Sequence, residues 1–174
     1  MQLDEVREQL NKFGKFVIQQ ARSRLTKGGK KLTKNDTKKL YNSLEYKPFR
    51  DGSSIGVYFY MEDYGKFQDQ GVKGTKSNYV ENKKSPFSYS SKMPNPEIFE
   101  SYIKRKGIKG RDKKTGRFIT NKSLQFLIAR SIFQKGIKAS MFFTKPFNQA
   151  YEKLPAELQE SFVKDIEKII FDNG

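Results

Sequence analysis

The sequence has no cysteine, no histidine and no tryptophan. Without cysteine it can form no disulfide and no thiolate nucleophile, and without histidine it can form no Ser-His or Cys-His catalytic pair. Zinc sites built from these two residue types are excluded as well. These absences leave few catalytic chemistries open. We expect no catalytic residue, no cofactor and no bound metal.

The sequence also lacks an apolar run near the roughly 18 residues that a membrane span needs. It has no basic-then-apolar leader, since Gln2–Glu5 already follow a helical pattern. These absences predict a soluble protein with no signal peptide and no membrane partner. Its 174 residues, without an internal repeat or a compositional boundary, predict a single domain over residues 1–174.

Acidic residues are scarce in two segments, which concentrate the positive charge. Arg22–Lys39 has eight basic residues and one acidic residue, and Lys104–Lys122 has nine and one. Together they supply +15 of the net charge of +16. Such concentration suits a polyanion, whose binding would be salt-dependent. The alternative is that both segments are solvated lysine-rich loops.

Several segments have the apolar spacing of amphipathic helices. We predict a helix from Asp4 to about Leu25 stopped by Gly28-Gly29, a short one from Pro96 to Gly107, one capped by Ser123 and ended by Gly136, and a last one from Pro155. The faces predicted to be buried are Val6, Leu10, Phe13, Val17, Ala21 and Leu25 in the first helix, Leu124, Leu127, Ile128 and Ile132 in the third, and Leu158, Phe162, Ile166 and Ile169 in the last.

The stretch Ile55–Gly74 opens with the strict alternation of a strand that buries one face, with Tyr58 and Tyr60 on the other face. We expect Ile55–Met61 to pair antiparallel with Glu45–Phe49 and to cover the first helix. The chain is therefore predicted to be α+β, with a long N-terminal helix and C-terminal helices packed on a small antiparallel sheet. Long polar loops complete it, the extended ones at about 72–95 and 104–122.

One set of residues has the order of a metal-dependent nuclease. Asp63 is followed by Glu81-Asn82-Lys83, and in such enzymes two carboxylates hold Mg²⁺ while a lysine steadies the attacking water. That chemistry needs an apolar core strand, whereas Tyr79–Ser85 is polar. The sequence therefore favours a loop over an active site here.

The adjacent Phe142 and Phe143 lie beside Pro146 on a short apolar link. Aromatic side chains of this kind more often form core or subunit contacts than base-stacking platforms. We do not expect both to face inward from so short a link, so one of them is predicted to contact another chain.

Several segments, in their order along the chain, resemble the neck or tail-completion proteins of double-stranded DNA bacteriophages, which are similar to minor tail and virion-morphogenesis proteins. Tyr60–Gly71 resembles a strand-to-turn signature of that family, and Lys138–Phe147 its C-terminal signature. The resemblance covers most of the chain, through Ala21–Thr33, Leu40–Tyr46, Tyr58–Gly74, Ser85–Tyr89, Ile103–Ile119 and Leu127–Tyr151.

This resemblance implies a non-enzymatic structural virion protein, made in the host bacterial cytoplasm and located in the neck or tail. It implies a homo-oligomeric ring at the head–tail junction that links portal or connector proteins to the tail around the DNA channel. A basic segment then meets packaged double-stranded DNA or an acidic partner, and we expect this to be Lys104, Arg105, Lys106, Lys109, Arg111, Lys113, Lys114 and Arg117. The expected subunit contacts are Tyr64, Phe67, Phe87, Tyr89, Phe142 and Phe143.

Both long loops, Thr75–Asn95 and Lys104–Lys122, are expected to become ordered on assembly. The alternative function that the charge supports is a sequence-independent nucleic-acid-binding module.

Overall fold

The computed structural model describes residues 3–26, 37–52 and 54–172, with side chains as far as Lys168. Its contacts divide the chain into two compact units. Unit 1 is formed by residues 1–65 and 141–174, and unit 2 by residues 66–140. The chain leaves unit 1 after residue 65, forms unit 2, and returns to unit 1 at residue 141.

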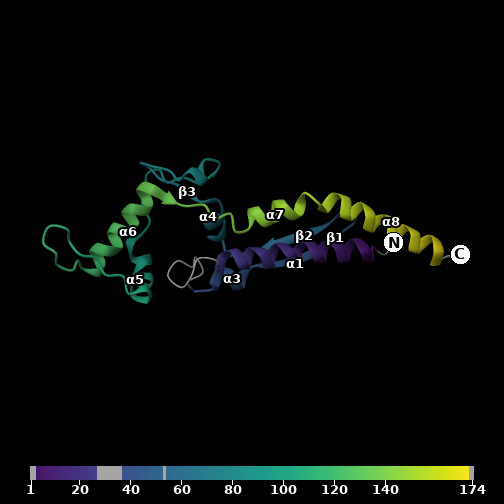
Figure 1. Ribbon diagram of the computed structural model, residues 1–174, viewed down its shortest axis with the longest axis horizontal. Helices are drawn as coiled ribbons and strands as arrows, with labels where there is room; N and C mark the ends of the chain where they lie inside the picture. The colour runs from purple at the N-terminus through teal and green to yellow at the C-terminus, as the bar shows by residue number, and fades with distance from the viewer. Residues whose placement is uncertain (1–2, 27–36, 53, 173–174) are drawn as a thin grey trace. The chain divides into compact units, whose positions relative to one another are not determined.

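Unit 1 contains a long N-terminal helix, a β-hairpin and the last two helices (Figure 1). This is the α+β arrangement that the sequence predicted. The predicted glycine stop at Gly28-Gly29 lies outside the described residues. The elements of unit 1 are α1 (Asp4–Thr26), α3 (Lys39–Ser43), β1 (Glu45–Asp51), β2 (Ser54–Tyr60), α7 (Thr144–Tyr151) and α8 (Leu154–Asp172).

The hairpin of β1 and β2 is antiparallel, with Tyr46 opposite Phe59. Its turn uses Gly52 with φ 53°, a left-handed conformation that glycine adopts without a Cβ clash. Phe59 packs toward α1, whereas Tyr58 and Tyr60 are half exposed. The predicted alternation and pairing are confirmed.

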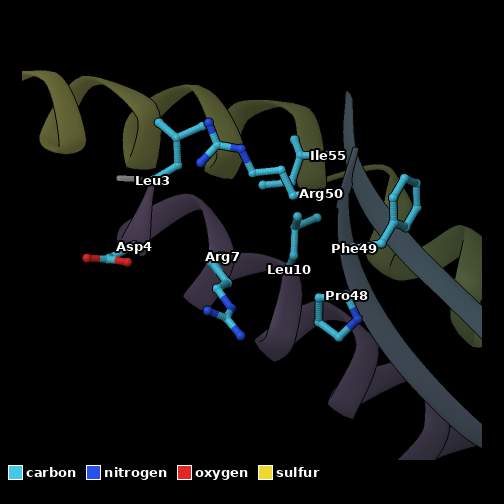
Figure 2. Close-up of a pocket in the computed structure, with 8 residues that line it drawn as sticks. All are labelled: Leu3, Asp4, Arg7, Leu10, Pro48, Phe49, Arg50 and Ile55. Carbon is cyan, nitrogen blue, oxygen red and sulfur yellow. The ribbon is translucent and has the colours of Figure 1, made fainter. Parts of the chain in front are cut away.

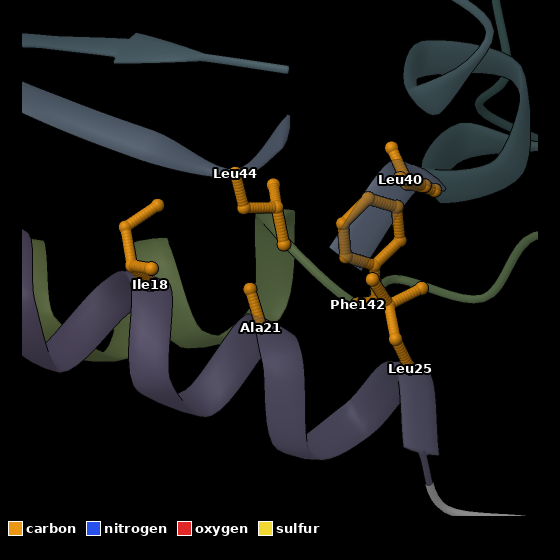
Figure 3. Packing of buried hydrophobic residues seen from close by; sticks show 6 residues of the cluster. All are labelled: Ile18, Ala21, Leu25, Leu40, Leu44 and Phe142. Carbon is orange, nitrogen blue, oxygen red and sulfur yellow. The ribbon is translucent and has the colours of Figure 1, made fainter. Parts of the chain in front are cut away.

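The core of unit 1 consists of two hydrophobic clusters on α1. The first, drawn in Figure 3, joins α1 to α3 and to the chain that enters α7. The second joins α1 to the hairpin and the start of α8, and Phe59 and Phe143 contact both clusters. Their buried members are Ile18, Ala21, Leu25, Leu40, Leu44 and Phe142 in the first cluster, and Phe13, Val17 and Leu154 in the second.

The expectation that Phe142 and Phe143 do not both turn inward is wrong. Phe142 is 1% exposed within the first cluster, and the ring of Phe143 lies edge-on to Phe59 at a centroid distance of 5.3 Å. Met141 has φ 50°, so the chain turns sharply just before the pair. That turn, with α7 starting at Thr144, brings both rings onto the core.

The buried face of α8 differs from the predicted one. Phe162 and Ile166 are exposed, while Ser161 and Asp165 are buried. The reason is Asp165, whose carboxylate accepts hydrogen bonds from the backbone N–H groups of Glu5 and Val6 at 3.0 and 3.1 Å. It caps the first turn of α1 from another helix, and this fixes which face of α8 turns inward. The predicted position Ile169 lies outside the described side chains.

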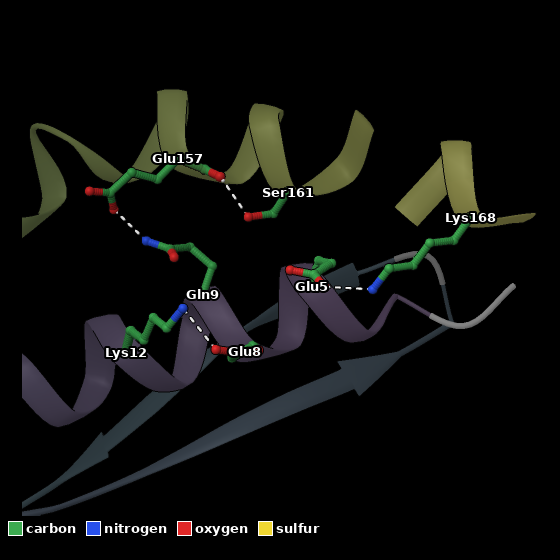
Figure 4. Close-up of polar contacts among 7 residues, drawn as sticks. All are labelled: Glu5, Glu8, Gln9, Lys12, Glu157, Ser161 and Lys168. Carbon is green, nitrogen blue, oxygen red and sulfur yellow. Dashed lines mark hydrogen bonds and ion pairs between the residues drawn. The ribbon is translucent and has the colours of Figure 1, made fainter. Parts of the chain in front are cut away.

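Polar contacts on both sides of this cap join α1 to α8 (Figure 4). Lys168 Nζ lies 2.6 Å from Glu5 Oε1, and Gln9 Nε2 donates to Glu157 Oε2 at 2.6 Å. Helices α1 and α8, which lie near the two ends of the chain, are therefore joined by polar contacts as well as by apolar packing.

Replacing Asp165 by alanine is expected to destabilise unit 1 by about 2 kcal/mol, because two N–H groups of α1 lose a charged acceptor. The measurement is urea unfolding followed by helical circular dichroism. The exposed neighbour Lys164 supplies the control, since Lys164→Ala removes a side chain of α8 that faces solvent. Equal midpoints for the two variants would contradict a capping role.

Unit 2 is built mainly from short elements (Figure 1). Its sheet is a two-residue antiparallel pairing of β3 with β4, extended by a parallel bridge between Lys73 and Ser88. None of the helices that the structure describes, in either unit, is long and apolar enough to cross a membrane. The elements are α4 (Gly65–Gln70, which begins at the end of unit 1), β3 (Val72–Lys73), the 3₁₀ helices η1 (Val80–Asn82) and η2 (Pro96–Phe99), α5 (Glu100–Lys106), α6 (Asn121–Lys135) and β4 (Gly136–Ile137).

Helix boundaries in unit 2 largely follow the predicted signals. The helical segment from Pro96 ends at Gly107, which has φ 60°, and α6 ends at Gly136. The predicted cap of α6 is wrong by three residues, because the Thr120 side chain accepts the N–H of Ser123 at 3.2 Å. The predicted stripe is also wrong at Leu127, which is 47% exposed. Gln125 and Ala129 are buried on α6 instead.

The long segment 74–95 has little regular structure but is tied into unit 2 by hydrogen bonds. Asn82 is fully buried; its Nδ2 donates to the carbonyls of Val72 and Ile137 at 2.9 and 2.8 Å, and its Oδ1 accepts the N–H of Ala139 at 2.8 Å. Ser85 Oγ donates to the carbonyl of Gly71 at 2.7 Å. Asn82 thus joins three stretches that are distant in sequence.

Candidate nucleic-acid interface

The positive charge of the chain is divided unequally between the units. Unit 2 has 18 basic and 5 acidic residues, a net +13, whereas unit 1 has 17 and 14, a net +3. The segment 104–122 accounts for +8 of the charge of unit 2. This segment is therefore the candidate polyanion-binding surface of the chain.

Residues Gly110–Ile119 form a tight β-hairpin between α5 and α6. Arg111 and Phe118 form an antiparallel bridge, and the N–H of Ile119 donates to the carbonyl of Gly110 at 3.0 Å. Gly116, with φ 69°, closes the turn by donating its N–H to the carbonyl of Asp112 at 2.9 Å. All side chains from Arg111 to Phe118 are exposed. The sequence predicted an exposed loop with turn signals that becomes ordered on assembly, whereas here the single chain forms a hairpin held by its own hydrogen bonds.

The Asp112 carboxylate holds the turn of the hairpin. Its Oδ1 accepts the N–H groups of Lys114 and Thr115 at 3.0 and 2.8 Å and the Thr115 hydroxyl at 3.0 Å. These bonds, first of all that from the Thr115 N–H, favour the ionised form and lower the pKa of Asp112. The acidic residue of this segment therefore acts on its own backbone.

Below neutral pH, this turn is expected to loosen only under strongly acidic conditions. Because the pKa of Asp112 is lowered in the folded hairpin, the stabilisation that its carboxylate gives is complete above the ordinary value of 3.8 and is lost as the pH falls through the lower folded value. The Thr115 amide resonance, followed by NMR, should titrate below pH 3.8. The same resonance in Asp112→Asn should not titrate, and a midpoint at or above 3.8 in the wild type would contradict the clamp.

Phe118 and Arg111 form a cation–π pair across the strands of the hairpin. The guanidinium carbon of Arg111 lies 4.2 Å from the ring centroid, and its Nη1 donates to the carbonyl of Gly116 at 3.3 Å. Lys109 Nζ approaches the same ring at 6.0 Å. Phe118 is 60% exposed, so its ring stiffens the surface of the hairpin without being buried.

The predicted cations of this segment fall into two groups. Lys104, Arg105 and Lys106 belong to the last turn of α5, and Lys104 Nζ pairs with Glu100 Oε1 at 2.7 Å. The predicted cations that the hairpin and its base present are Lys109, Arg111, Lys113, Lys114 and Arg117.

Some of the aromatic residues predicted to contact other subunits pack inside their own unit, and others keep exposed area. Phe67 packs on Phe87 at a centroid distance of 4.7 Å, and Tyr89 lies 5.9 Å from Phe133. Phe142, as described above, is enclosed in unit 1 and offers no surface to another chain. Tyr64 and Phe67 keep substantial exposed area, while Phe143 packs in the core of unit 1.

The nuclease-like residues occupy different settings. Asp63 belongs to unit 1 and Glu81 to unit 2. Glu81 lies in η1 and pairs with Lys138 at 2.7 Å. Within the described part of the chain, no group of three or more acidic residues is placed to hold a metal ion.

Unit 1 has a pocket of about 410 Å³ between the start of α1 and the hairpin of β1 and β2 (Figure 2). Asp4 is its acidic lining residue, beside two arginines and apolar side chains. The lining residues are Leu3, Asp4, Arg7, Leu10, Pro48, Phe49, Arg50 and Ile55.

The sequence-based interpretation did not single out Phe118, Asp112 or Thr115. The pattern Asp112-Lys113-Lys114-Thr115-Gly116 was the available signal, because aspartate at the start of a turn and glycine at its left-handed position specify a tight turn. The glycines of this segment were interpreted only as loop markers, so the hairpin was not predicted.

Comparison with known proteins gives no relative: no family model, no curated protein and no solved structure matches the chain. The fold and the site thus define an α+β chain of two units, one of which presents a basic β-hairpin.

Proposed function

We propose that this chain is a structural virion protein of a double-stranded DNA bacteriophage. It assembles as a ring at the head–tail junction, as a neck or tail-completion protein, and links portal or connector proteins to the tail around the DNA channel. The proposal rests first on the order of sequence segments that resembles this family.

The observation that carries the proposal is the separation of charge between the units. Unit 2 has a net +13 and an exposed basic hairpin, whereas unit 1 has a net +3, although it includes the basic segment Arg22–Lys39. A ring around DNA requires a cationic surface for the phosphates and a different surface for the neighbouring proteins. The two units supply surfaces of these two kinds.

Unit 1 has side chains suited to contacts between proteins. Phe162, Val163 and Ile166 form an exposed apolar face on α8, and Tyr58 and Tyr60 are exposed on the outer face of the hairpin. Aromatic and apolar residues are enriched at the centres of protein interfaces. Ring contacts through these faces leave the hairpin of unit 2 available to DNA.

Electron microscopy of the native particle that contains this chain tests the proposal. A ring of density around the central channel, with the hairpin near the DNA, is the expected result. A particle without the chain, or with the chain outside the neck and tail, would contradict it.

The same hairpin also supports the alternative of a sequence-independent nucleic-acid-binding module. In that case the isolated chain binds duplex DNA with a salt dependence set by the hairpin cations, and the chain is missing from particles. The microscopy therefore separates the two functions.

A further inference from the structure

We propose that the hairpin Arg111–Phe118 is a preformed binding site for the phosphate backbone of duplex DNA, with Lys113, Lys114 and Arg117 as the contacting cations. Arg111, Phe118 and Asp112 hold the hairpin in shape. The inference deepens the proposed function and rests on it for its biological setting, since it names the surface that meets DNA.

The contacting cations are displayed on a turn that the chain itself holds in shape. Lys113 and Lys114 are adjacent at the tip, and the Asp112 carboxylate holds the turn around them by accepting hydrogen bonds from two backbone N–H groups and from the Thr115 hydroxyl. Residues 111–118 have a net charge of +3. A polyanion that binds here does not have to order the turn, so less conformational entropy is lost.

Unpaired bases of a single strand fit this hairpin less well than phosphates do. Proteins that bind single strands stack bases on open aromatic rings. Phe118 is the aromatic residue of this hairpin, and the guanidinium of Arg111 already lies 4.2 Å from the centre of its ring. The ring holds Arg111 in place, and the cations around it are suited to phosphates.

An acidic protein surface also fits this hairpin less well than phosphates do. Centres of protein interfaces are depleted of lysine and enriched in aromatic residues and arginine. The hairpin has two lysines at its tip and two arginines beside them. The ring of its aromatic residue, Phe118, is already in contact with the guanidinium of Arg111. Phosphate contact needs only positive charge of this kind and carries no sequence information.

The test is a titration of the full chain with a fluorescent duplex of mixed sequence over a series of salt concentrations. The variant is Lys113→Glu, Lys114→Glu and Arg117→Glu together. The matched control is Lys83→Glu, Lys84→Glu and Lys92→Glu, which changes the net charge by the same amount at exposed positions of unit 2. Both variants alter exposed side chains, and thermal unfolding establishes that each is folded.

We expect the hairpin variant to bind at least about a hundredfold more weakly near 100 mM salt, and the slope of log affinity against log salt to become shallower by about 3. The control is expected to lose less than about tenfold and to keep its slope. Equal losses in the two variants would overturn the inference, because total charge would then explain the binding.

Two further results would also overturn it. Tighter binding to a single strand than to the duplex, abolished by Phe118→Ala, would identify a base-stacking site. Undiminished duplex binding by the hairpin variant, together with its failure to enter particles, would identify an acidic protein as the ligand. A chain that is missing from particles but shows the expected loss of duplex binding would contradict the neck function and leave this inference intact.

Discussion

Replacing Asn82 by alanine is expected to destabilise unit 2 by about 3 to 5 kcal/mol. The substitution leaves the carbonyls of Val72 and Ile137 and the N–H of Ala139 without their partner, and each buried unpaired group costs about 1–3 kcal/mol. The measurement is hydrogen exchange of the amides of β3, β4 and their neighbours, which reports the opening of unit 2 separately from unit 1.

The local geometry leaves little opportunity for another group to replace Asn82. Gly71 packs directly against its amide with φ 74°, and a Cβ at that glycine would collide with Asn82 Oδ1 and the N–H of Ala139. Asn78→Ala is the control, because Asn78 is exposed in the same segment and should change stability by less than about 0.5 kcal/mol. Similar exchange rates in the two variants would show that Asn82 does not hold segment 74–95.

The sequence predicted the fold well where a local pattern determines the structure. The alternation that begins at Ile55 specified both faces of β2, and the apolar spacing from Asp4 specified α1. Glycines at 107 and 136 marked the ends of α5 and α6 correctly. In each case the neighbours that decide the structure lie within one element or one turn.

The prediction failed where a polar side chain acts on a distant segment. Asp165 caps a helix whose N–H group at Glu5 is 160 residues away, so the periodicity of α8 could not reveal which face is buried. The sequence placed Asn82 only between Glu81 and Lys83 of the nuclease-like set. Its side chain in fact joins the segments around Val72 and Ala139 of unit 2 by hydrogen bonds. Hydrogen bonds between remote segments leave no period in the sequence.

The candidate site shows the same division. Its charge was evident from composition, but the separation of +13 from +3 depends on a boundary between units that composition does not mark. The shape of the hairpin depends on the carboxylate of Asp112 and on the stacking of Arg111 over Phe118. A count of lysines and arginines does not distinguish Arg111 from the other cations, and it leaves out Asp112 and Phe118 altogether.

Replacing Phe142 by alanine is expected to destabilise unit 1 by about 3–5 kcal/mol. The ring is 1% exposed and fills the space between α1 and α3, where it contacts the cluster of Leu25, Leu40 and Leu44. Its removal loses the free energy of burial and leaves a cavity that the surrounding helices fill only in part. Urea unfolding followed by helical circular dichroism measures the loss.

Phe162→Ala is the matched control for Phe142→Ala, because it removes the same side chain from an exposed position of the same unit. Its effect on stability should stay below about 1 kcal/mol, while Phe142→Leu should cost less than about 1.5 kcal/mol because leucine fills most of the space. If Phe142→Ala left stability unchanged and instead prevented assembly, the Phe142 side chain would have to contact another chain. Destabilisation without an effect of Phe142→Leu on assembly assigns Phe142 to the core and leaves the contacts between protomers to exposed residues of unit 1 such as Tyr58 and Tyr60.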